Sequence, residues 1–277
     1  MKRPSEIRTA PRDWLLVLKT AYPFLVNLGI GDLLLFGSQA LSVYLKSPLR
    51  SKDLDFVSSQ IGPRHLEALR KHLESSGLET RNTTVQSKPL AKARMTIYTI
   101  ELRLGRKPFF LEIFDRILDG RNPSILTPHA QRTRKWNLDL WVPSPNAVVA
   151  LRLSFRQPEG ISRLNAIRLN NFIQQSRSKL NFNEIATMIT QWGMDDRVKE
   201  NLRTLHKSHR LRIRGENLLY PRIDLQPAQR ALREMDLARL KGKGSPKKHV
   251  RPRLRGSPAQ VDVREMRRKR FESLSGY

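Results

Sequence analysis

The chain has 277 residues, in which 52 Lys and Arg face 25 Asp and Glu, so its formal net charge is +27. Such an excess favours a polyanionic partner, nucleic acid first, although an acidic protein would also fit. Cysteine is absent, which excludes disulfides, thiolate zinc sites and Cys nucleophiles and leaves carboxylates or imidazoles for any metal. No apolar run approaches the ~18 residues of a membrane span, and the start of the sequence has no signal-like stretch. We therefore expect a cytoplasmic protein that makes no membrane contact.

Residues 1–143 mix the periodicities of helices and strands. In the whole chain, 39% of the residues are hydrophobic, which suffices for one substantial core or two small ones. Short apolar runs bounded by glycine predict strands, and apolar residues three to four apart predict amphipathic helices. We expect a break or kink of the first helix at Pro23 and a hairpin around Gly105. The expected helices cover 11–28, 39–46 and 63–75, and the expected strands cover 33–36, 53–57, 78–85, 94–104, 108–114 and 137–142.

From Ser144 onward the pattern is helical. Ser144 followed by Pro145 is typical of an N-cap and a first helical turn, and this helix should extend through Phe155. Residues 241–277 contain twelve Lys and Arg against three acidic residues, with interrupting glycines and prolines. This composition predicts a basic, disordered arm, which either binds nucleic acid or only aids solubility. Further helices are expected near 159–176, 182–192, 195–208 and 226–240, so the chain should divide into an α+β domain over 1–143, a helical domain over 144–240 and the arm over 241–277.

A glycine and a serine follow the first expected strand directly. Gly37 and Ser38 lie between the apolar run 33–36 and the next expected helix. A strand that runs into a helix in this way leaves backbone N–H groups and the Ser hydroxyl free to bind phosphate. The pair is therefore a candidate triphosphate site, although an ordinary strand-to-helix turn has the same pattern.

Several acidic residues lie within expected strands, and three of them are candidate metal ligands. Asp53 and Asp55 point to the same face because side chains alternate along a strand, and two such carboxylates repel unless a cation lies between them. With oxygen ligands and no thiols, that cation would be Mg²⁺ or Mn²⁺. Glu112 is surrounded by apolar residues, where a charge is costly to bury unless a metal or a base function uses it. Glu101 has a similar setting on the neighbouring strand and stays open as the third acid, although the more apolar flanks favour Glu112.

Together, residues 33–57 and 108–114 resemble the nucleotidyltransferase superfamily of the DNA polymerase β type, with most similarity to the minimal prokaryotic and AbiEii-like nucleotidyltransferases. The resemblance implies a nucleotidyltransferase-type mixed sheet with flanking helices, followed by a helical domain. It also implies residue roles. Gly37 and Ser38 would bind the nucleotide phosphates, Asp53 and Asp55 would hold two metal ions, and Glu112 would help to hold one of them and act as base, or orient the base, toward the acceptor hydroxyl.

Basic residues near these motifs have two possible interpretations. Arg50 and Lys52 precede the first acid and would contact phosphates, but a solvated loop explains them equally well. The AbiEii-like enzymes carry a Lys on the first helix after the sheet and a Lys-Asp pair further on. This chain has Arg152 on that helix and lacks the pair. Arg152, Arg156 and Arg168 would either line a nucleotide or nucleic-acid cleft or be solvated.

The expected function is a Mg²⁺- or Mn²⁺-dependent enzyme that transfers an NMP group from an NTP to a hydroxyl. The acceptor would be RNA, for example a tRNA end, or a protein side chain. We expect RNA rather than DNA as the nucleic-acid partner, bound through the basic surface and the arm. Two alternatives remain. One is a non-catalytic nucleic-acid-binding protein on the same scaffold, and the other is a toxin or defence component with the same chemistry and an antitoxin partner.

Overall fold

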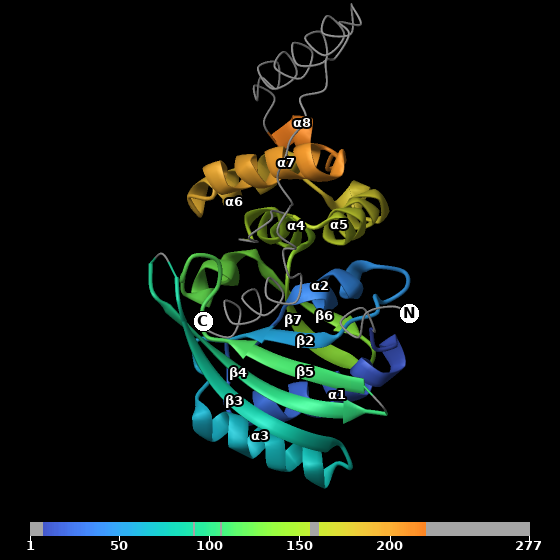
Figure 1. Ribbon diagram of the computed structural model, residues 1–277, viewed down its shortest axis with the longest axis vertical. Coiled ribbons are helices and arrows are strands. Elements are labelled where there is room, and N and C mark those ends of the chain that lie inside the picture. Colours follow the sequence, from blue (N-terminus) through green and yellow to red (C-terminus); the bar gives the residue numbers. More distant parts are fainter. Residues whose placement is uncertain (1–7, 91, 106, 156–160, 220–277) are drawn as a thin grey trace, which may run out of the picture. The chain divides into compact units, whose positions relative to one another are not determined.

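The computed structural model describes residues 8–219, except Ala91, Arg106 and 156–160 (Figure 1). The helix expected over 226–240 and the arm over 241–277 lie outside this part of the chain. Contacts group the described residues into one compact unit. The division at residue 143 into separately folding domains stays a prediction. In the described ranges, no helix combines the length and the apolar character needed to cross a membrane.

The fold class is α+β, as expected, and its centre is a mixed sheet of five strands in the order β1-β2-β5-β4-β3. Strands β2 and β5 are parallel, whereas the other neighbours are antiparallel. The expected strands over 53–57 and 94–104 are confirmed at both ends, while the first strand is shorter and the third extends to Pro89. The strands are β1 (Leu34–Leu35), β2 (Asp53–Val57), β3 (Glu79–Pro89), β4 (Arg94–Leu104) and β5 (Lys107–Phe114).

Two helices, α1 (Pro11–Asn27) and α3 (Pro63–Ser75), cover one face of this sheet (Figure 1). Leu54 and Phe56 of β2 point into the core under these helices and are fully buried. Because side chains alternate along a strand, the residues between them point to the opposite face. Helix α1 continues past Pro23, and the buried side chains of its last turns hold it against the sheet.

The helices of the second half gather on the other side of the sheet, together with α2 (Figure 1). Ser144 caps the first of them, because its hydroxyl accepts a hydrogen bond of 3.2 Å from the N–H of Ala147. This helix, α4, is buried along almost its whole length at the centre of a second apolar core. The helices are α2 (Gly37–Tyr44), α4 (Pro145–Ser154), α5 (Arg163–Gln175), α6 (Phe182–Gln191), α7 (Asp195–His209) and the short α8 (Glu216–Leu219).

Between Phe114 and Ser144 the sequence predicts only one strand, over 137–142, but the structure has a hairpin of β6 (Ala130–Lys135) and β7 (Leu138–Pro143). Strand β6 carries polar and basic side chains without an apolar alternation, so it has no strand signal of its own. Trp136 and Asn137 form the turn with φ values of 55° and 64°, the left-handed geometry that two-residue hairpins require.

Candidate active site

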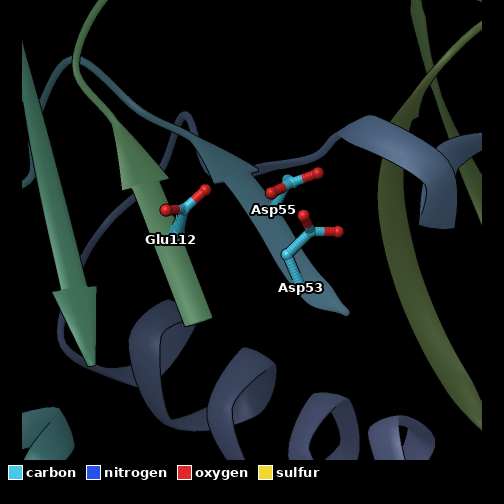
Figure 2. Close-up of side chains that lie close together, drawn as sticks. All are labelled: Asp53, Asp55 and Glu112. Atoms are coloured by element: carbon cyan, nitrogen blue, oxygen red, sulfur yellow. The ribbon is translucent and has the colours of Figure 1, made fainter. Parts of the chain in front are cut away.

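Three carboxylates converge on the sheet face opposite α1 and α3 (Figure 2). Asp53 and Asp55 come from β2, and Glu112 comes from the parallel neighbour β5, where it lies directly beside Asp55. One oxygen from each of the three groups lies within 4.8 Å of the others, and all three residues are partly buried. The group is therefore able to bind a divalent metal ion through oxygen ligands alone.

Burial and mutual repulsion make these carboxylates hard to ionise together. Burial raises the pKa of Asp55 well above its ordinary value, and the charges of Asp53 and Glu112 raise it further, while Arg152 and Lys52 oppose the shift. Burial, and then the charge of Asp53, also raises the pKa of Glu112. A cation among the three groups would remove this repulsion.

The structure brings Glu112, and not Glu101, to the two aspartates. The register of β4 and β5 pairs Glu112 with Thr99, whereas Glu101 pairs with Phe110, which lies two residues before Glu112 on β5. Glu101 therefore shares the face of the carboxylate group without belonging to it. The more apolar neighbours of Glu112 in the sequence favour it over Glu101, but the register between the strands decides which residue lies beside the aspartates.

Gly37 lies against the carboxylate of Asp55. Its φ is +62°, and a Cβ atom at this position would collide with Asp55, falling 2.6 Å from Cγ. The N–H of Phe36 donates a hydrogen bond of 2.8 Å to the carbonyl of Asp55, which holds the start of α2 at β2. The first backbone N–H that bonds back into the helix is that of Ala40, so the preceding N–H groups remain available to an anion.

Ser38 contacts Asp53 through a second serine. The hydroxyl groups of Ser38 and Ser51 are 2.7 Å apart, and Ser51 Oγ donates to Asp53 Oδ1 at 2.9 Å. The backbone of Ser51 is fixed in turn by two hydrogen bonds to the backbone of Thr9. Gln39, which is fully buried, donates to the carbonyl of Asp53. The sequence interpretation did not identify Ser51 or Gln39 as site residues. Their only signal in the sequence is position, because Gln39 follows Gly37 and Ser38, and Ser51 lies two residues before Asp53.

The two basic residues proposed to contact phosphate differ in position. Lys52 is exposed and lies near enough to the carboxylates to oppose the raised pKa values of Asp55 and Glu112. For Arg50 the structure shows a backbone role, because its carbonyl accepts a hydrogen bond of 2.8 Å from the guanidinium of Arg168. Their part in binding nucleotide stays a prediction.

Three arginines gather beside the carboxylates: Arg8, Arg152 of α4 and Arg168 of α5. Burial, and then the charges of Arg8 and Arg152, lower the pKa of Arg168 to about 10. Burial also lowers the pKa of Arg152, against the influence of Asp55 and Asp53. Within the described ranges, no carboxylate forms an ion pair with any of the three guanidinium groups. Arg156 lies outside those ranges.

No protein-family model and no curated protein sequence matches the chain. Similar solved structures include a proposed nucleotidyltransferase from Helicobacter pylori, with a TM-score of 0.43 and 15% identity, covering 87% of this chain and 100% of that one. Another is an antigenic nucleotidyltransferase-like protein from Paracoccidioides brasiliensis, with a TM-score of 0.40 and 16% identity, covering 75% and 96% of the two chains. The AbiEii-like subgroup stays a prediction.

Proposed function

We propose that the protein is a metal-dependent nucleotidyltransferase, which transfers an NMP group from an NTP to a hydroxyl. The observation that carries this proposal is the convergence of Asp53, Asp55 and Glu112 within 4.8 Å. Beside them lies Gly37, whose lack of a side chain lets the start of α2 approach Asp55. Carboxylate oxygens alone make up this donor set, which suits Mg²⁺ or Mn²⁺. A divalent ion bound there would neutralise charge on the transferring phosphates and lower the pKa of the attacking hydroxyl.

The chain's own residues supply the other parts of the mechanism. Asp53 and Asp55 would hold the metal, and Ser51 orients the carboxylate of Asp53 through the hydrogen bond to Oδ1. Glu112 Oε accepts the proton of the acceptor hydroxyl.

The phosphates of the NTP occupy the side of Asp55 where α2 begins. The N–H groups of Gly37 and Ser38 belong to the first turn of α2 and have no partner within the helix, and the positive end of the helix dipole favours an anion there. Arg152 and Arg168 supply guanidinium groups that repel one another until an anion neutralises them. Arg50 and Lys52 add further positive charge close to the carboxylates.

The proposal is tested by label transfer. The protein is incubated with each α-³²P-NTP, Mg²⁺ or Mn²⁺, and total cellular RNA or protein, and a gel shows which class of acceptor becomes labelled. We expect labelling by the wild type and none by the double variant Asp53→Asn, Asp55→Asn. The variant should fold, and without metal it should melt at or above the wild-type temperature, because the repulsion is gone. Asp139→Asn removes an exposed carboxylate of β7 and is the matched control, with labelling unchanged.

Equal labelling by the wild type and the double variant would overturn the metal assignment. Absence of labelling in the wild type with every NTP and both acceptor classes would favour the non-catalytic alternative. The toxin role and the antitoxin partner stay predictions, and growth on induction of the gene is the measurement that addresses them.

A further inference from the structure

Three arginines follow helix α7 in a segment whose burial alternates from residue to residue. Arg210, Arg212 and Arg214 are exposed, whereas Leu211 is half-buried and Ile213 is 3% exposed. A period of two is the alternation of an extended chain, in which every second side chain points to the same side. The three guanidinium groups therefore lie together on the solvent side, while the apolar residues between them pack against the core of the helical half.

The backbone of this segment is fixed by one side chain of α5. Asn170 Nδ2 donates a hydrogen bond of 2.9 Å to the carbonyl of Arg212, and Asn170 Oδ1 accepts one of 2.8 Å from the N–H of Arg214. These two backbone groups flank Ile213, whose own N–H donates to the carboxylate of Glu216 at 3.1 Å. The arginines are therefore carried by a backbone that is already ordered, which lowers the entropic cost of binding a ligand.

The positive charge of α5, α7 and this segment is not neutralised locally. Residues 161–183 and 201–215 contain nine Lys and Arg and no Asp or Glu. Glu216, the first acid after the second range, already contacts Nε2 of His206 at 2.9 Å. Within the ranges that the structure describes, the guanidinium groups of Arg210, Arg212 and Arg214 form no ion pair and no hydrogen bond. Such a surface attracts a polyanion.

One face of α5 continues the same surface. Residues at spacings of four, three and four lie on one face of a helix, and Asn170 has Arg163 and Gln174 on its face, both exposed. These two residues are about 16 Å apart along the helix axis. We call the exposed polar residues of both elements the arginine surface, which consists of Arg163, Gln174, Arg210, Arg212 and Arg214.

Helix α5 separates the arginine surface from the proposed catalytic site. Arg168 and Asn170 are two residues apart and therefore point about 200° away from each other around the helix. Arg168 contacts the carbonyl of Arg50 and belongs to the basic cluster beside the carboxylates. Asn170 faces the arginine segment instead. A ligand of the arginine surface therefore needs none of the three carboxylates.

The chemistry of the arginine surface favours the backbone of a nucleic acid over its bases. A guanidinium group binds two phosphate oxygens at once, and the amide of Gln174 can donate to or accept from a ribose hydroxyl. The exposed large apolar side chains of α5 and α8 are Leu164, Ile167 and Leu218, none of which is aromatic. Unpaired bases are bound mainly by stacking on aromatic rings, so the surface lacks the groups that a single strand requires.

We infer that the arginine surface binds the backbone of double-helical RNA. In such RNA the bases stack on one another, and the wide, shallow minor groove presents phosphates and 2′-hydroxyl groups to a protein. Arg210, Arg212 and Arg214 contact phosphates along one strand, Arg163 contacts a further phosphate, and Gln174 bonds to a 2′-hydroxyl. Binding requires neither a metal ion nor an NTP, so this inference goes beyond the transfer reaction proposed above and holds whether or not transfer occurs.

The test measures fluorescence anisotropy of a labelled RNA duplex of about 16 base pairs with the full chain, over a range of salt concentrations and without metal or NTP. The triple variant Arg210→Gln, Arg212→Gln, Arg214→Gln should bind at least about tenfold more weakly. It should also flatten the dependence of log K on log salt by about two to three units, because each phosphate contact contributes close to one. The variant Arg210→Lys, Arg212→Lys, Arg214→Lys keeps the charges and should retain the wild-type slope.

A matched control loses three exposed positive charges from α1, α3 and β6, and it should keep the wild-type affinity and slope. Its substitutions are Lys19→Gln, Arg64→Gln and Arg134→Gln. Thermal melts check the fold of each variant, and all should melt as the wild type because the substituted side chains are exposed.

An equal loss of affinity in the control would overturn the inference, because net charge alone would then explain binding. An equal effect of the triple variant on a single-stranded RNA, or on a DNA duplex of the same sequence, would overturn the choice of double-helical RNA. Competition by polyglutamate as strong as that by unlabelled duplex at equal charge would overturn nucleic acid as the partner. If the triple variant loses duplex binding while the wild type transfers no label, the RNA surface is supported and the proposed catalytic function fails.

Discussion

A Cβ atom at Gly37 would occupy the space taken by the carboxylate of Asp55. Because glycine has no side chain, the backbone at the start of α2 lies directly against this candidate metal ligand. Two requirements meet at this position. The backbone has a positive φ, which glycine adopts without strain, and it also passes directly over a carboxylate. The contact couples the strand-to-helix turn to the three carboxylates. We therefore expect a substitution that displaces the turn to weaken metal binding as well.

Gly37→Ala should therefore lower the stability of the protein and abolish Mg²⁺ binding. Gly29→Ala is a matched control, because Gly29 has φ +85° but no atom within 4 Å of an added Cβ. Alanine at either position costs about 1–2 kcal/mol for the left-handed backbone, and only position 37 adds the collision. Thermal melts with and without Mg²⁺ measure both effects. Retention of the Mg²⁺-dependent rise in Tm by Gly37→Ala would contradict the assigned contact.

The sequence predicts the part of the site that a single strand encodes. The alternation Asp53, Leu54, Asp55, Phe56 defines both a strand and the face that carries the acids, and the structure confirms both. Apolar flanks also mark Glu112 and, less strongly, Glu101. Only the parallel pairing of β2 with β5 places Glu112 beside Asp55, and pairing between distant segments leaves no local signal.

Residues whose roles depend on long-range contacts are missed for the same reason. Ser51 reaches Asp53 because Thr9 holds its backbone, and Arg8 joins the basic cluster with Arg168 from the helical half. Neither residue belongs to a periodic pattern. Strand β6 is missed because its exposed polar residues carry no hydrophobic alternation, and only β7 reveals that a hairpin exists.

Ser51→Ala tests whether the serine chain positions a metal ligand. The change removes the hydrogen bond to Asp53 and leaves the buried hydroxyl of Ser38 without that partner, at a cost of about 1 kcal/mol. Mg²⁺ affinity and kcat should both fall. Ser42→Ala is the control. Ser42 is buried in α2, the helix that contains Ser38, and its hydroxyl bonds to backbone groups of Ser38 and Leu49 but not to Asp53. It should lose similar stability with unchanged Mg²⁺ affinity, and equal loss of affinity in both variants would refute the positioning role.

The stability of the metal-free protein should fall as the pH rises through the raised pKa of Asp55. Folding holds a proton on this carboxyl at pH values where the unfolded chain, with an Asp pKa of about 3.9, has lost it. The stabilisation from this proton is present at low pH and is lost on the alkaline side of the folded pKa. Denaturant melts of the wild type and of Asp55→Asn measure the difference against pH. We expect the wild type to lose stability relative to the variant as the pH rises, and saturating Mg²⁺ to reverse that trend, because protons and metal compete.

Arg168→Gln tests the basic cluster as the phosphate site. If the NTP phosphates neutralise Arg8, Arg152 and Arg168, removal of one guanidinium should raise the Kd for NTP by at least tenfold, in line with the ~1.5–3 kcal/mol of a charged hydrogen bond. The free energy of unfolding without nucleotide should change less than the free energy of nucleotide binding. The substitution removes the hydrogen bond to the Arg50 carbonyl, but it also relieves the repulsion from Arg8 and Arg152. Arg168→Lys keeps the charge and should lie between the two. Arg132→Gln, which removes an exposed arginine of β6, is the control. Nucleotide binding is followed by titration calorimetry in Mg²⁺, and an unchanged Kd in Arg168→Gln would place the triphosphate away from this cluster.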